Sequence, residues 1–208
     1  DDARVALALR SVPAEVRARI AGVLGDDGAE RFLRAALGGD DAVVLRAHTH
    51  RLSRDAVIER LRAELPGATV TAGRVSPLAV RVSGGGDPTR TAVFREGLAG
   101  VQEEAAQCVA QMAAVGPGMA VLDVCAGRGG KSVVAAMGLA HKGSLHAVDL
   151  FPEKLARLRE ELARVGLDAG LDVFTTAADL TRGVGALAAK APARGAVARA
   201  TRHRPRPR

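Results

Sequence analysis

The chain has 208 residues, of which 48% are hydrophobic, which suits one large or two small folded domains. Its net charge of +7 and isoelectric point near 10.6 would suit a nucleic-acid-binding protein. Seven of the basic residues, however, follow residue 189, where no acidic residue occurs: Lys190, Arg194, Arg199, Arg202, Arg204, Arg206 and Arg208. The rest of the chain is balanced at 23 basic and 23 acidic residues. With four Phe and no Trp or Tyr, the composition argues against an aromatic platform for stacked bases.

Other broad classes are also excluded by the sequence. It contains neither a long apolar run of membrane-spanning length nor an N-terminal signal peptide, so we expect a cytoplasmic protein. Its two cysteines, Cys108 and Cys125, are too few for a disulfide framework, and no Cys/His spacing is typical of zinc. We therefore expect no metal site.

The N-terminal part predicts two regions. Residues 1–40 form a helical segment that Gly25 interrupts. Residues 41–95 form a small α+β subdomain, with strands near residues 42–45, 69–71 and 78–82. Ser53 is placed to cap a helix whose apolar stripe consists of Val57, Ile58, Leu61 and Leu65.

Residues 96–188 predict a nucleotide-binding half-domain. Its first helix has an apolar face of Val101, Ala105, Cys108, Met112 and Val115, so Cys108 is interpreted as a core thiol. An apolar run from Met119 then breaks into a glycine turn, followed by a helix to Ala140. Strands at residues 143–149 and 172–176 enclose a further helix that opens at Pro152. This alternation predicts the βαβαβ half of a doubly wound parallel sheet.

The glycine turn, CAGRGGKS from Cys125 to Ser132, allows three interpretations. A Walker A loop requires glycine where Cys125 stands, so an ATPase is disfavoured. The spacing G-x-G-G only partly matches a nicotinamide dinucleotide motif. A ligand of the S-adenosylmethionine type fits best, because an acid ends each strand: Asp123 beside the methionine moiety, Asp149 for the ribose hydroxyls and Asp179 for the adenine amino group.

Two segments also resemble a known family. FREGLAGVQEEAAQ (residues 94–107) followed by VLDVCAGRGGKS (121–132) is similar to the Sun/RsmB/NOP-type RNA cytosine-5 methyltransferases, whose pattern is close to VQDEASQ and then VLDLCAAPGGKT. The resemblance covers roughly residues 10–182. It implies a Rossmann-like S-adenosylmethionine domain, an RNA-contacting role for the small subdomain and RNA, in particular ribosomal RNA, as partner. It also implies that the cofactor loop consists of Cys125, Ala126, Gly127, Arg128, Gly129, Gly130 and Lys131.

The chain departs from the family pattern in two places. Gly127 and Arg128 replace an Ala-Pro pair that would fix the loop backbone. The family's catalytic cysteines, in motifs after the third strand, have no counterpart, and the resemblance places Cys125 in the cofactor loop. No catalytic residue is therefore assigned. We expect an incomplete Rossmann-like sheet, a methyltransferase truncated by a frame change near Ala189.

Residues 189–208 form a basic Arg/Pro-rich segment expected to be disordered. Three functional hypotheses remain open. The chain is an S-adenosylmethionine-dependent RNA methyltransferase by descent, inactive as it stands; or a non-catalytic cofactor- or RNA-binding remnant; or a different nucleotide-binding Rossmann protein.

Overall fold

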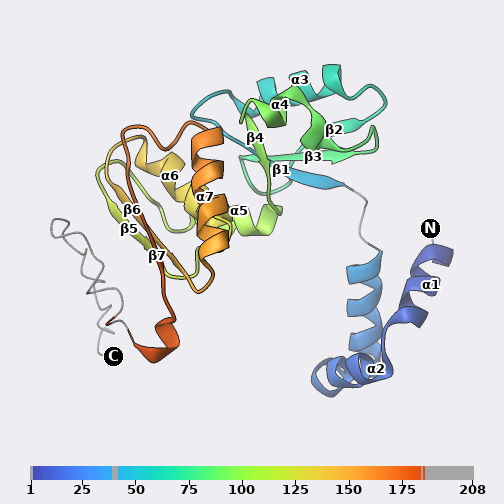
Figure 1. Cartoon of the computed structure of the whole chain (residues 1–208). Coiled ribbons are helices and arrows are strands. Elements are labelled where there is room, and N and C mark those ends of the chain that lie inside the picture. The colour runs from blue at the N-terminus through green and yellow to red at the C-terminus, as the bar shows by residue number, and fades with distance from the viewer. Residues whose placement is uncertain (1, 39–41, 184, 186–208) are drawn as a thin grey trace, which may run out of the picture. The chain divides into compact units, whose positions relative to one another are not determined.

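The computed structural model (Figure 1) describes residues 2–38, 42–183 and 185. Contacts divide the chain into two units, residues 1–42 and 43–208. The basic segment expected at residues 189–208 lies outside the described residues. In the described part of the chain, no helix has the length and apolar character needed to cross a membrane.

The first unit consists of helices α1 (Asp2–Ser11) and α2 (Ala14–Leu37). Pro13 precedes the first turn of α2 with an extended backbone, where its missing N–H costs no helical hydrogen bond. Gly25 lies inside α2 with φ 71° and ψ 168°, so the helix is kinked there. The predicted helical segment and its interruption at Gly25 are thus present.

The second unit begins with a small α+β subdomain. Its elements are β1 (Val43–Ala47), α3 (Arg54–Glu64), β2 (Thr69–Ala72), β3 (Ala79–Ser83), the 3-10 helix η1 (Pro88–Arg90), α4 (Ala92–Arg95) and β4 (Ala99–Val101). The strands form an antiparallel sheet in the order β2-β3-β1-β4. Because β4 belongs to this sheet, the subdomain extends past residue 95, where the sequence suggested its end.

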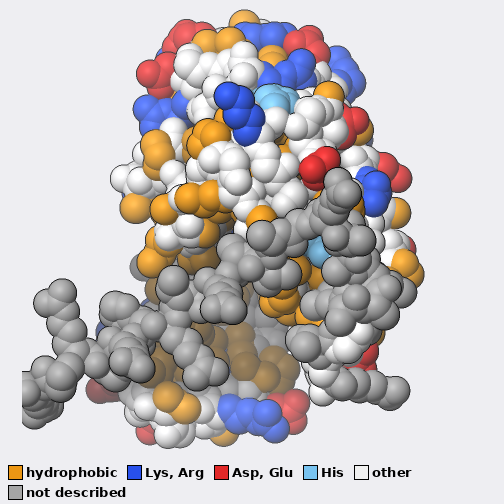
Figure 2. Space-filling model, turned by 90° about the vertical axis from the view of Figure 1, so that its left-hand side faces the viewer, with side chains coloured by type: hydrophobic (Ala, Val, Ile, Leu, Met, Phe, Trp, Pro, Cys, Tyr) orange, Lys and Arg blue, Asp and Glu red, His pale blue; other side chains and the backbone are white. Residues whose placement is uncertain are grey.

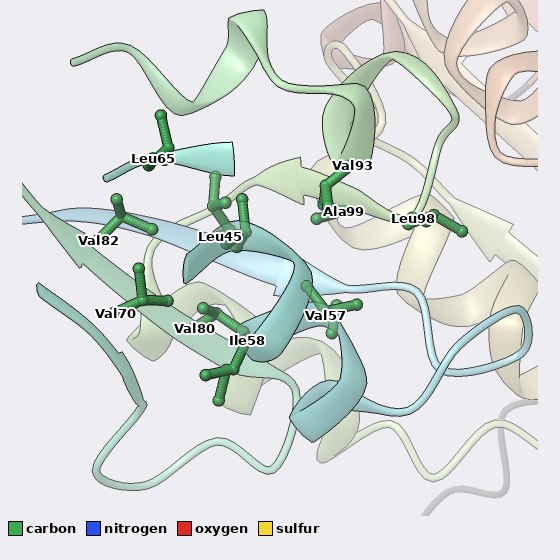
Figure 3. Close-up of a cluster of buried hydrophobic side chains, with 12 residues drawn as sticks. Leu45, Val57, Ile58, Leu65, Val70, Val80, Val82, Val93, Leu98 and Ala99 are labelled. Carbon is green, nitrogen blue, oxygen red and sulfur yellow. The ribbon is translucent and has the colours of Figure 1, made fainter. Parts of the chain in front are cut away.

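The core of this subdomain lies between α3 and the sheet (Figure 3). The predicted stripe of α3, Val57, Ile58, Leu61 and Leu65, is buried against residues such as Leu45, Val80 and Val82 from the strands. The hydroxyl of Ser53 accepts a hydrogen bond from the Ala56 N–H at 3.3 Å, which confirms the predicted N-cap.

The remainder of the unit is a three-stranded parallel sheet with its connecting helices. Helix α5 (Glu104–Gln111) leads into β5 (Ala120–Asp123), α6 (Gly130–Leu139), β6 (Ser144–Asp149), α7 (Pro152–Arg164), β7 (Asp172–Ala177) and the 3-10 helix η2 (Leu180–Arg182). The strand order is β5-β6-β7. Helices α6 and α7 cover the same side of this sheet (Figure 1), and their inward leucines share one core with it. The predicted Rossmann-like βαβαβ half is confirmed.

The predicted apolar face of α5 is wrong. Val101 belongs to β4 and is 55% exposed, Met112 is 82% exposed, and Cys108 is only half-buried. The buried residues of the helix are Gln107 and Ala110. A polar side chain is tolerated there because every polar atom of Gln107 finds a hydrogen-bond partner, a possibility that hydrophobic periodicity does not detect.

Strand β5 forms one edge of the parallel sheet within the described residues. Leu122 of this strand is 50% exposed, and Val124 directly after the strand is 47% exposed. Figure 2, viewed from the side of the parallel sheet, shows hydrophobic side chains at the surface.

Candidate cofactor site

The carboxyl ends of the three parallel strands bring the three predicted aspartates to one edge of the sheet. Asp123 is the last residue of β5 and pairs in register with Ala147 of β6. Asp149, the last residue of β6, pairs with Ala177, two residues before Asp179. The crevice at this edge is where ligands bind in open α/β sheets, so the geometry brings together the acids that the sequence singled out.

The glycine turn between β5 and α6 is shaped by two residues with positive φ. Gly129 has φ 90° and ψ 14°, and a Cβ built on it would lie 2.2 Å from Cδ1 of Leu158 in α7. Gly127 has φ 55°, but nothing lies within 4 Å of its Cβ position. Gly129 is therefore required by the packing of α7 under the turn, whereas Gly127 borders open space on the side available to a ligand.

Asp149 connects β6 to the turn. Its Oδ2 accepts a hydrogen bond from the Gly127 N–H at 2.8 Å, and its Oδ1 accepts one from the Phe151 N–H at 3.1 Å. The Phe151 hydrogen bond is the largest cause that lowers the pKa of Asp149, and the Gly127 hydrogen bond and Lys154 add to it. The carboxylate is therefore ionised at neutral pH, and each oxygen retains a lone pair for a further donor.

Asp123 and Asp179 are also engaged with nearby backbone. Asp123 accepts from the buried hydroxyl of Ser132 at 2.6 Å and from the Cys125 N–H at 3.3 Å, so it ties both ends of the turn together. Asp179 accepts from the N–H and hydroxyl of Thr181 and caps η2. Both carboxylates therefore have a structural task at the positions where the sequence predicts ligand contacts.

The remaining predicted loop residues differ in exposure. Ala126 is buried, and its N–H donates to the Val148 carbonyl at 2.9 Å, which joins the turn to β6. The side chains of Cys125, Arg128 and Lys131 are exposed. Among the described residues, no cluster of His, Cys, Asp or Glu could hold a metal ion. A cavity of about 450 Å³ lies in the small subdomain, lined by residues such as Glu64, Gly86 and Arg95, and does not include the turn.

Comparisons with known proteins give relatives of one kind, although no family model matches the chain. Ribosomal RNA small subunit methyltransferase B of Pseudomonas syringae is 34% identical over 137 residues, covering 66% of this chain and 30% of the relative. The putative methyltransferase Rv1407 of Mycobacterium tuberculosis is 37% identical over 180 residues, covering 78% of this chain and 38% of the relative. The solved structure of the protein PH0851 superposes with a TM-score of 0.74 at 26% identity, covering 83% of this chain and 38% of the other. The chain belongs to the Sun/RsmB family of RNA methyltransferases.

The chain spans about a third of the length of these two Sun/RsmB relatives. In this chain the Sun/RsmB loop pattern carries Gly127 and Arg128 in place of Ala and Pro. The left-handed φ of Gly127 is one that glycine adopts without strain, so the loop keeps its turn without the proline.

Residues 101–107, which carry the VQDEASQ-like pattern, attach the small subdomain to α5. Glu104 accepts hydrogen bonds from the backbone N–H groups of Val75 and Ser76 at 2.6 and 2.8 Å. Burial opposes ionisation of Glu104, but these hydrogen bonds outweigh it and lower its pKa. Gln107 donates to the Gln102 carbonyl at 2.8 Å and accepts from the Ser76 hydroxyl at 2.9 Å. This segment is thus a clamp between elements, a role that sequence reasoning did not assign to it.

A buried basic network behind the turn was also missed from the sequence. Arg46 of β1 is 2% exposed, and its Nη1 donates to the Gly130 carbonyl at 2.8 Å and to Oε1 of Gln102 at 2.7 Å. Its Nη2 lies 3.0 Å from Nε2 of His48, whose Nδ1 lies 2.8 Å from the Gly97 carbonyl. Because a carbonyl can only accept, Nδ1 carries the proton and Nε2 accepts from Arg46. An arginine between apolar strand residues gives no sequence signal of burial.

Proposed function

We propose that this chain binds S-adenosylmethionine at the glycine turn and that it derives from enzymes that methylate C5 of cytosine in ribosomal RNA. The observation that carries the proposal is the ionised Asp149 carboxylate, held by the Gly127 N–H beside a turn whose outer side is open. Membership of a family that includes a ribosomal RNA methyltransferase supports the chemistry.

The residues present fit the cofactor. Asp149 has one lone pair free on each oxygen for the ribose hydroxyls, and Asp179 follows the neighbouring strand for the adenine amino group. The turn from Cys125 to Lys131 offers backbone N–H groups, and Asp123 lies on the methionine side at the end of β5. The bound cofactor would supply the methyl group.

We further propose that these 208 residues alone do not transfer a methyl group to RNA. Addition to cytosine requires a thiolate that can reach the base, and this sequence contains only Cys108 and Cys125. Cys108 is half-buried on α5, and Cys125 belongs to the cofactor turn, where its N–H donates to Asp123. These positions favour a cofactor- or RNA-binding remnant as the second candidate function.

Calorimetry with S-adenosylmethionine, NAD and ATP tests the binding proposal. The intact chain should bind S-adenosylmethionine alone, and Asp149→Ala should weaken that binding by at least about tenfold, because two charge-assisted hydrogen bonds are lost. Asp168→Ala removes an exposed carboxylate that precedes β7 and so does not lie at the carboxyl ends of the strands, and it should leave the affinity unchanged. Unchanged affinity in Asp149→Ala would remove the ribose assignment, and tight binding of NAD or ATP instead would overturn the proposal.

The second part of the experiment uses labelled S-adenosylmethionine and ribosomal RNA. We expect no 5-methylcytosine in the RNA after incubation with the chain. Its appearance would contradict the assignment of an inactive chain and show that one of the two cysteines serves the reaction.

A further inference from the structure

Arg46 is a buried cation that lies between the small subdomain and the glycine turn. In β1 it is in register with Ala79 of β3 and Gly100 of β4. A Cβ on Gly100 would lie 3.3 Å from Nη2 of Arg46, so the glycine leaves the space that the guanidinium fills. The nearest carboxylate, that of Glu161 in α7, is 3.9 Å from Nη2 and is itself paired with Arg164 at 2.7 Å.

The hydrogen bonds of this guanidinium are not those expected of a purely stabilising group. Its Nε is buried without a hydrogen-bond partner, and burial is the largest cause that lowers the pKa of Arg46, to about 10. Replacing a buried charge by an apolar side chain of similar volume is often neutral or stabilising, so a gain in stability is a weak reason for its presence. Its two shortest hydrogen bonds, by contrast, both come from Nη1 and join two separate segments, since they reach Gln102 and Gly130.

One of the two acceptors belongs to the start of α6. Nη1 donates to the carbonyl of Gly130, the first residue of the helix, and to Oε1 of Gln102. Gln102 is fixed in turn, because its N–H donates to the Val44 carbonyl and its own carbonyl accepts from Gln107. The peptide of Gly130 is thus held from the small subdomain through a chain of hydrogen bonds that runs over Arg46, Gln102 and Gln107.

We propose that Arg46 is a positioning residue of the cofactor turn, which fixes the Gly130 peptide and so makes cofactor affinity depend on the hydrogen bonds that this side chain donates from β1. This inference rests on the proposed binding of S-adenosylmethionine. Arg46 would not touch the ligand, because it lies in the antiparallel sheet and acts through the first turn of α6. A rigid first turn presents its N–H groups to a ligand without an ordering cost at binding.

Three variants test the inference. Arg46→Met removes the charge and the hydrogen bonds, and Arg46→Lys keeps the charge but loses the fork that reaches both Gln102 and Gly130. Val57→Ala serves as the matched control, because it opens the core of the small subdomain without touching the network. Each variant is measured by amide hydrogen exchange without cofactor and by calorimetry with S-adenosylmethionine.

In Arg46→Met the amides of residues 130–133 should exchange at least about tenfold faster, and the affinity for S-adenosylmethionine should fall by a similar factor. Arg46→Lys should lie between this variant and the original chain, which also covers the case in which Arg46→Met does not fold. Val57→Ala should change neither quantity at the turn. Equal exchange in the Arg46 variants and the original chain, or an equal effect in Val57→Ala, would overturn the inference. If the original chain does not bind S-adenosylmethionine, the proposed function fails, and hydrogen exchange alone decides whether Arg46 holds the turn.

Discussion

His48 allows the buried network to be tested by pH. Burial, followed by the charge of Arg46, lowers the pKa of His48 from 6.5 to about 3, despite the Gly97 hydrogen bond that opposes the shift. In the unfolded chain the imidazole binds a proton near pH 6.5, whereas in the folded chain it stays neutral. The neutral His48 therefore does not reduce the free energy of unfolding above pH 6.5, and that free energy falls as the pH drops from 6.5 towards 3, because only the unfolded chain binds the proton.

The magnitude follows from the two pKa values. Between about pH 8 and pH 5 the unfolded chain gains nearly one proton at His48, which lowers the free energy of unfolding by about 2 kcal/mol. His50 acts in the same direction, because burial also lowers its pKa. A comparison of variants isolates His48, since the titration of every other group is common to both proteins.

Urea denaturation followed by far-UV circular dichroism at the two pH values measures this difference. In His48→Gln the loss of stability between about pH 8 and pH 5 should be smaller than in the original chain by about 2 kcal/mol. His141→Gln, which changes an exposed imidazole outside the Arg46 network, is the matched control for the loss of a histidine. If His48→Gln loses as much stability as the original chain, His48 is not held neutral in the folded state and the described network is incorrect.

Two further substitutions test local features of the fold. Gly129→Ala should lower the free energy of unfolding by about 2–4 kcal/mol, because the backbone there is left-handed and the added methyl group would overlap Leu158. Gly127→Ala should lower it by only about 1 kcal/mol, because nothing lies near its Cβ position. Equal urea midpoints for the two variants would refute this difference. Ser53→Ala should lower the free energy of unfolding by about 1 kcal/mol, because α3 loses its N-cap. Ser53→Asp keeps an acceptor for the Ala56 N–H, so its stability in thermal denaturation should match that of the original chain. Equal losses of stability in both variants would contradict the cap.

The parts of the fold that could be predicted from sequence are those with a local signal. The stripe from Val57 to Leu65 repeats with helical spacing, and the glycine turn follows an apolar run. Helix α4 and strand β4 are four and three residues long, too short for a periodic pattern. Their geometry depends on Gly97, which has φ 70° and whose Cβ would lie 2.1 Å from the Arg164 carbonyl oxygen. That requirement comes from α7, far along the chain.

The residues of the candidate site also divide into those with a local sequence signal and those whose environment depends on distant residues. Asp149 was found because parallel strands end at one edge, so a sequence position becomes a spatial one. Arg46 was not found, since its burial depends on Gln102 and Gly130, which follow it by 56 and 84 residues. The polar burial of Gln107 depends likewise on acceptors and donors from other elements, and the hydrophobic rule placed Cys108 and Met112 inward instead.

Strand β4 follows residue 95 in the sequence but pairs with β1 of the small subdomain, which limits where the chain can be cut into fragments. A fragment that ends at residue 95 would contain α3 and three strands, yet it would leave the edge of β1 without its partner and Arg46 without Gln102. A fragment that begins at residue 96 would keep the glycine turn but lose the group that holds Gly130. Exchange of the half that contains the glycine turn between relatives would therefore keep the hydrogen bonds of Arg46 to Gln102 and Gly130 only if β1 is transferred together with residues 99–107 and the turn.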